Sequence, residues 1–208
     1  MINARFARFS STWTKRRGNK RFIVKLRLSN IQSVNRRKIT FPTGALGYSQ
    51  AREGRHVSKN LFDATVANEV KTRLGKLEPQ SERRWGKMTA AQMLAHCSLS
   101  MQWAVGEVVP EKGALPARLM GRLVKPMVFR NEDPLRKNAP TAKSLLVADE
   151  RDLRRERERL SGLIDKFAVG GAAGCTKNPH SFFGKMTPEE WAILMYKHLD
   201  HHLRQFGV

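Results

Sequence analysis

From residue 58 onward, the sequence predicts an all-α protein: a four-helix bundle with a long crossover between its second and third helices. Apolar residues recur at helical spacing along four segments, and two of these segments begin with a capping box. Convincing strands are absent, so a helical bundle is the natural architecture. We therefore divide the chain into a basic segment, residues 1–57, which we expect to be disordered, and a bundle, residues 58–208.

The first two helices are predicted before the crossover. The first runs roughly over residues 63–77, with Asp63 as a plausible N-cap. The second begins at Thr89, which forms a T-x-x-Q capping box with Gln92, and ends near Gly106. The apolar positions of the first helix are Val66, Val70, Leu74 and Leu77.

A connection rich in proline follows, from about residue 108 to residue 143. Its length suggests a crossover along the bundle rather than a tight hairpin. Within it, residues 117–125 could form a short helix. The side chains that we expect to face inward are Leu119, Met120, Leu123 and Val124.

The third and fourth helices of the bundle have clear limits. The third is predicted over residues 149–167, and its RRERER sequence is best interpreted as a solvated face with ion pairs along the helix. The chain then breaks at Gly170, Gly171 and Gly174. The fourth helix has Thr187 as its cap, Pro188 at its first position and Glu190 completing a T-x-x-E box, and it ends at Phe206 before Gly207.

Histidines lie on the inward faces of two predicted helices. His202 lies about 40° from His198 around the last helix, and His96 is on the inward face of the second. A buried imidazole needs a hydrogen-bond or metal partner, and histidines four residues apart can share a divalent cation. The alternatives are that these histidines are ordinary core residues, or that His201 and His202 cover a helix C-terminus. Residues that could orient a ligand or line a pocket are Gln205, Ser100, Trp103, Trp191 and His201, although core packing alone would explain both tryptophans.

Other catalytic patterns are absent from the sequence. It contains no phosphate-binding loop, no C-x-x-C pair and no H-E-x-x-H motif. Cys97 is expected to be a packing residue, and Cys175 has no identifiable activator. We therefore assign no catalytic residue.

Charge is concentrated near the N-terminus. The chain has a net charge of +21, and residues 1–56 contain 14 Lys/Arg and one acidic residue, Glu53. Three interpretations remain open: a basic arm that binds phosphates, a transit peptide, or a segment that is absent from a mature protein starting at Val57. Nucleic-acid binding is expected only through this segment.

The remaining composition bears on location. Two cysteines form no disulfide framework, so we expect a reducing, cytoplasmic setting. No run of about 18 or more apolar residues occurs, so we expect no membrane partner.

Two stretches of the chain resemble a known group of proteins. The first stretch, Trp85 to His96, reads W-G-K-M-T-A-A-Q-M-L-A-H. The second begins with H-S-F-F-G-K-M-T (His180 to Thr187) and continues through Trp191 to K-H-L-D-H-H-L-R-Q-F-G (Lys197 to Gly207). These stretches resemble the DinB/YfiT-like superfamily of four-helix bundles, and most closely its DUF1569 branch of uncharacterised bacterial proteins. The resemblance covers about residues 59–208.

The resemblance implies an up-down-down-up bundle with a divalent metal, nickel, zinc or iron. Its ligands would be His96, His198 and His202, which match the superfamily's positions. It also implies thiol-dependent transferase, isomerase or hydrolase chemistry on a small-molecule or thiol substrate, and a homodimer. A noncatalytic sensor or interaction domain, and a protein that binds nucleic acid through residues 1–56, remain the alternatives.

Overall fold

The computed structural model describes residues 11–16, 19–24, 58–131 and 133–208. The chain divides into two compact units, residues 1–53 and 54–208. In the first unit, β1 (Ser11–Arg16) pairs with β2 (Asn19–Val24) as an antiparallel hairpin, and Ser11 lies opposite Val24. Both strands contain the β-branched and aromatic residues that favour this conformation. We expected residues 1–57 to be disordered, and the hairpin departs from that expectation. Apart from residues 11–16 and 19–24, this range lies outside the described residues.

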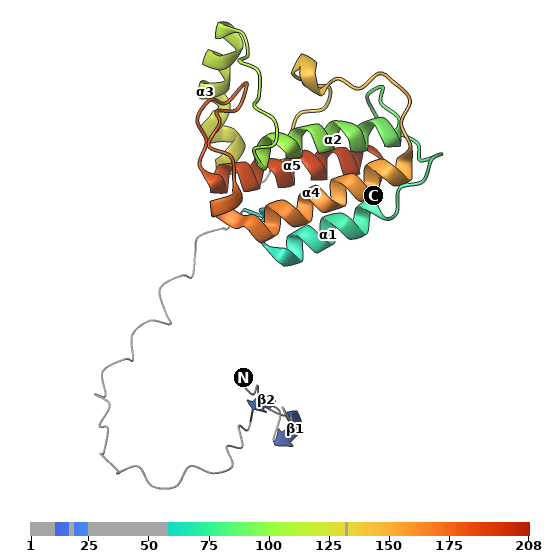
Figure 1. The fold of residues 1–208 in the computed structure, drawn as a ribbon, viewed down its shortest axis with the longest axis vertical. Helices are drawn as coiled ribbons and strands as arrows, with labels where there is room; N and C mark the ends of the chain where they lie inside the picture. The colour runs from blue at the N-terminus through green and yellow to red at the C-terminus, as the bar shows by residue number, and fades with distance from the viewer. Residues whose placement is uncertain (1–10, 17–18, 25–57, 132) are drawn as a thin grey trace, which may run out of the picture. The chain divides into compact units, whose positions relative to one another are not determined.

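The described part of the second unit is helical, which confirms the all-α prediction for this unit. Figure 1 shows α1, α2, α4 and α5 side by side, with α3 crossing one end of this group. A single 3₁₀ turn, η1, lies in the connection between α3 and α4. The bounds are α1 Ala64–Leu74, α2 Ala90–Ala104, α3 Leu115–Arg130, η1 Lys143–Leu145, α4 Leu153–Gly174 and α5 Pro188–Gln205.

Three of the four predicted starts of the bundle helices are confirmed by their caps, whereas α4 begins at Leu153, later than the predicted residue 149, with Asp152 as its N-cap. The Asp63 side chain accepts a hydrogen bond from the backbone N–H of Thr65 at the start of α1. Reciprocal capping boxes form between Thr89 and Gln92 at α2, and between Thr187 and Glu190 at α5. Each cap satisfies backbone N–H groups that have no partner within the helix. These local contacts explain why the starts were predictable.

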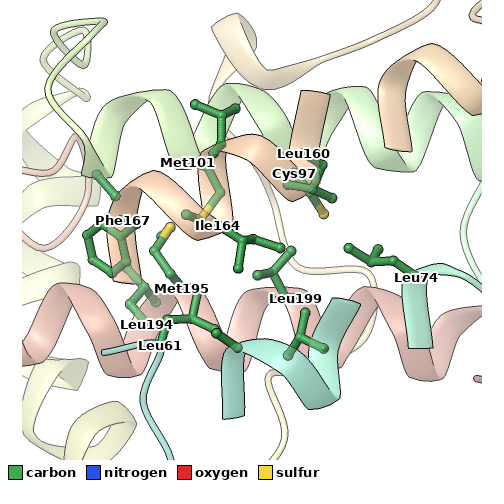
Figure 2. Close-up of a cluster of buried hydrophobic side chains, with 14 of the residues drawn as sticks. Leu61, Leu74, Cys97, Met101, Leu160, Ile164, Phe167, Leu194, Met195 and Leu199 are labelled. Carbon is green, nitrogen blue, oxygen red and sulfur yellow. The ribbon is translucent and has the colours of Figure 1, made fainter. Parts of the chain in front are cut away.

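A continuous apolar core joins the four packed helices. Figure 2 shows side chains from α2, α4 and α5 meeting those of α1 and the residues just before it. Phe167 of α4 stacks on Phe62, with ring centroids 4.9 Å apart. Burying such side chains supplies the main driving force for folding. The labelled core residues are Leu61, Leu74, Cys97, Met101, Leu160, Ile164, Phe167, Leu194, Met195 and Leu199.

The predicted break after the third bundle helix occurs at Gly171. This residue has φ 52° and ψ −148°, outside the helical region, although helical turns continue to Gly174. Glycine alone adopts this conformation readily, because it has no Cβ. The helix is therefore interrupted where the sequence indicated, but it extends beyond the predicted end at Phe167.

The prediction for the crossover helix was wrong about its length and its buried face. α3 extends beyond the predicted 117–125 at both ends, and Leu119, Met120 and Leu123 are exposed rather than inward. Val124 is half-buried, as predicted, and Gly121 is the one buried residue of the helix. A Cβ on Gly121 would overlap the carbonyl oxygen of Phe182. The helix thus packs through Gly121 together with Val124, Val128 and Phe129, a face that the apolar pattern did not single out.

None of the described helices is long and apolar enough to cross a bilayer.

Candidate metal centre

Three histidine rings meet between α2 and α5. His96 comes from α2, and His198 and His202 come from successive turns of α5. One nitrogen from each ring lies within 4.8 Å of the others. The Nε2 atom of His198 is 3.0 Å from Nε2 of His96 and 3.2 Å from Nε2 of His202. The helices therefore bring together the three residues that the sequence analysis singled out.

The Nδ1 atom of His96 faces a backbone acceptor. It lies 2.8 Å from the carbonyl oxygen of Leu145, at the end of η1. A carbonyl oxygen can only accept a hydrogen bond, so Nδ1 must carry the proton. In neutral His96, the Nε2 atom therefore carries a lone pair and no hydrogen.

The same tautomer follows for His198 from the geometry of Ser100. The Ser100 hydroxyl donates to the carbonyl oxygen of Cys97, at 2.8 Å. Its oxygen is then the acceptor for Nδ1–H of His198, at 3.0 Å. Nε2 of His198 again carries no hydrogen.

Gln205 sets the tautomer of His202. Its amide nitrogen donates to the carbonyl oxygen of Trp85 at 2.7 Å, so its amide oxygen faces Nδ1 of His202 at 2.8 Å. The chain passes Gln205 at Gly86, which has φ 78° and whose added Cβ would lie 2.5 Å from the Gln205 amide nitrogen. Because Gly86 has no Cβ, the Gln205 amide can occupy the position from which its oxygen faces Nδ1 of His202.

The three rings consequently direct bare Nε2 lone pairs at one another. With both Nδ1 atoms protonated, no hydrogen lies between the Nε2 atoms of each close pair, and the three lone pairs form a site that could hold a cation. Burial lowers the pKa of His96, holds the pKa of His198 well below its usual value and lowers that of His202 to about 3; the neighbouring imidazoles add to the effect. A proton is therefore a poor occupant at neutral pH.

A divalent metal fits the donor set. Nitrogens bound at about 2.0–2.1 Å from one metal are roughly 2.9 Å apart at a right angle and 3.4 Å apart at the tetrahedral angle. Two of the three Nε2 separations, 3.0 and 3.2 Å, fall within that interval, and all three nitrogens lie within 4.8 Å of one another. Each ring also has its Nδ1–H bonded to an acceptor, the usual arrangement around metal-binding histidines.

His201 lies outside this group. Its Nδ1 donates to the carbonyl oxygen of Leu135 at 3.1 Å, and its ring contacts those of Trp85 and His202, with centroids 5.5 and 5.1 Å away. The backbone contact holds the half-buried ring beside the centre. His201 therefore contacts the ring of His202, but its own nitrogens are not among those that converge.

Trp103 and Trp191 are buried and contact a histidine that the sequence analysis did not select. The ring of His180 lies 5.8 Å from that of Trp103 and 5.3 Å from that of Trp191. Its Nδ1 accepts hydrogen bonds from the backbone N–H groups of Phe182 and Phe183. Burial lowers the pKa of His180 to about 4. In the sequence, the H-S-F-F-G motif (His180 to Gly184) is the signal that marks this histidine.

Neither cysteine is an activated nucleophile. Burial raises the pKa of Cys97 far above its usual value and that of Cys175 to about 11. The thiolate is the reactive form of cysteine, so both residues stay unreactive near neutral pH. The packing role expected for Cys97 agrees with its complete burial.

Comparison with known proteins places this bundle in a family. No curated protein and no solved structure matched the chain. The family model described as "Protein of unknown function (DUF1569)" matches residues 58–207, which include α1 to α5 and all three converging histidines. The chain therefore belongs to the DUF1569 family.

Proposed function

We propose that His96, His198 and His202 hold a divalent metal, nickel, zinc or iron, and that this centre serves a transfer or hydrolysis reaction on a small molecule, with a thiol as substrate or co-substrate. The observation that carries the proposal is the set of three Nε2 lone pairs with fixed Nδ1–H tautomers. A proton is disfavoured among them, whereas a metal would satisfy all three at once.

The donor set also bears on the chemistry. None of the hydrogen bonds described for the three rings goes to a carboxylate, so the ligands stay neutral and leave the full charge on the metal. A dication held by these residues would lower the pKa of a bound water or thiol. The reacting thiol would come from another molecule, because neither Cys97 nor Cys175 is activated.

The residues around the histidines have defined tasks in this proposal. The Leu145 carbonyl, Ser100 and Gln205 keep the protons on Nδ1 and aim Nε2 at the metal. His96 and His202 are buried, while His198 retains some accessible surface.

The absence of a carboxylate partner also supports a second candidate, a noncatalytic metal-dependent sensor or interaction domain. General acid–base chemistry usually needs a proton acceptor within hydrogen-bonding reach, and we assign none. In either case we propose that the helices follow the up-down-down-up order of the DinB/YfiT-like superfamily. We also propose that the protein forms a homodimer and is located in the cytoplasm.

Metal analysis of tag-free protein tests the proposal. The wild type would be compared with His96→Ala and His198→Ala/His202→Ala variants, after incubation with zinc or nickel and removal of free metal. His201→Ala is the matched control, because it removes a neighbouring histidine of α5 that lies outside the group. Circular dichroism of the metal-free proteins verifies that each variant folds.

We expect about one metal per chain in the wild type and in His201→Ala, and none in the other two variants. The metal should also raise the melting temperature of the first two proteins only, because it binds the folded state. Equal metal content in all four folded proteins would refute the site. If the site holds, thiol-dependent transfer and hydrolysis assays then separate the enzyme from the sensor.

A further inference from the structure

Helix α3 turns a row of large apolar side chains outward. Leu115, Leu119, Leu123 and Met127 are 76%, 62%, 69% and 70% exposed, and Met120 beside them is 54% exposed. The first four follow one another at intervals of four residues and so lie along one face of the helix. We call these five residues the α3 stripe.

The helix is firmly attached through its other face. Gly121 packs against Phe182, and Lys125 forms an ion pair with Glu190 at 2.8 Å. Lys197 of α5 donates to the carbonyl oxygens of Val128 and Asn131, both at 2.8 Å. The stripe is therefore held outward by the fold, and Figure 1 shows α3 crossing the end of the other helices.

The charge of α3 has a single sign. The helix contains Arg118, Arg122, Lys125 and Arg130 and no acidic residue. Independently, residues 1–56 have a net charge of +13 from 14 Lys/Arg and one acidic residue. The chain thus combines an exposed amphipathic helix with a second strongly basic segment.

We propose that α3 docks its stripe into the interface of an anionic lipid bilayer. An amphipathic helix with basic residues beside an apolar face lies in the plane of such an interface, with the apolar side chains about 5–10 Å deep. Anionic headgroups attract the flanking cations of α3. The expectation of no membrane partner rested on the lack of a spanning segment, which does not address a helix lying on the surface.

Charge disfavours the other occupants of this face. Two copies of α3 packed together would bring Arg118, Arg122 and Arg130 of one copy close to those of the other, with no acidic residue in the helix to pair them. A nucleic acid would match the cations, but its phosphate backbone would leave the apolar stripe without a partner. An anionic bilayer satisfies both the stripe and the charges.

Vesicle co-sedimentation of the full chain tests the proposal. Vesicles of phosphatidylcholine alone would be compared with vesicles containing about 30% phosphatidylserine. The test variant is Leu119→Asp/Leu123→Asp. Its matched control, Leu146→Asp/Val169→Asp, replaces two apolar residues outside α3 that are 65% and 90% exposed, and it changes the net charge by the same amount. Sedimentation velocity gives the oligomeric state of each protein.

We expect the wild type and the control to bind the phosphatidylserine vesicles similarly, with little binding to phosphatidylcholine alone. The α3 variant should bind at least about tenfold more weakly, because two apolar anchors are lost from the interface. Absence of wild-type binding, or equal weakening in both variants, would overturn the proposal. The proposal would also be overturned if the wild type is a dimer, the α3 variant alone is a monomer, and vesicle binding is the same in both. A second copy of the chain would then occupy the stripe.

Discussion

Replacing Ser100 by alanine separates a metal-positioning role from ordinary packing. Ser100 is buried, and its oxygen is the acceptor for Nδ1–H of His198. The variant leaves that N–H without an acceptor as long as Nε2 of His198 binds the metal. Metal-free protein can escape the penalty, because the proton can move to Nε2 and donate to the lone pair of His96 or His202. The cost should therefore fall mainly on the metal-bound state.

The expected loss of affinity follows from this unsatisfied donor. A buried donor without a partner costs about 1–3 kcal/mol. Loss of a residue that orients a metal ligand typically lowers metal affinity about 10- to 100-fold, equivalent to roughly 1.4–2.8 kcal/mol. Both estimates predict a weakening of one to two orders of magnitude for Ser100→Ala.

Ser98→Ala is a close control on the same helix. Ser98 is also buried, but its hydroxyl has no hydrogen-bond partner among the described residues. Zinc affinity would be measured by competition with a chromogenic chelator, and thermal unfolding would be followed with and without metal. We expect wild-type affinity for Ser98→Ala and a larger metal-dependent stability loss for Ser100→Ala. Equal affinities for the two variants would refute the tautomer argument.

Three further predictions follow from contacts around the site. Gly86→Ala should weaken zinc binding measured by chelator competition, because its Cβ would displace the amide of Gln205. Asp200→Asn should lower the free energy of urea unfolding by about 1–3 kcal/mol without changing metal content, because Arg73 and Arg204 both lose their charged partner. Metal-free protein should lose stability as the pH falls from about 6.5 to about 4, because the unfolded state binds protons at histidines whose pKa is lowered in the folded state, His180 among them. His180→Asn should make this pH dependence shallower, and an unchanged slope would contradict the contribution of His180.

The helix starts could be predicted because their causes are local. Thr89 and Thr187 each satisfy backbone N–H groups within three residues, so the capping pattern carries its own structural reason. The pairing of His198 with His202 is equally local, since one turn of helix separates them. The all-α character of the bundle unit follows from such signals.

The misassigned face of α3 shows where sequence periodicity stops being informative. Its apolar residues follow helical spacing, and such a stripe usually marks the buried side of a helix. Here the packed side contains Gly121, which closely approaches Phe182, together with Val128 and Phe129, and these contacts join segments far apart in the chain. Periodicity reveals that a helix has an apolar face, but it does not reveal what covers that face.

By itself, the sequence determined the capped helices, the inward histidines of α2 and α5 and the match to the DUF1569 family. Only the tertiary structure decided that the three Nε2 atoms converge, and that Leu145, Ser100 and Gln205 fix the proton on each Nδ1. Helix caps and spacing arise from neighbours along the chain. The tautomer of a histidine depends on acceptors brought to it by packing, up to 98 residues away for the pair of Ser100 and His198.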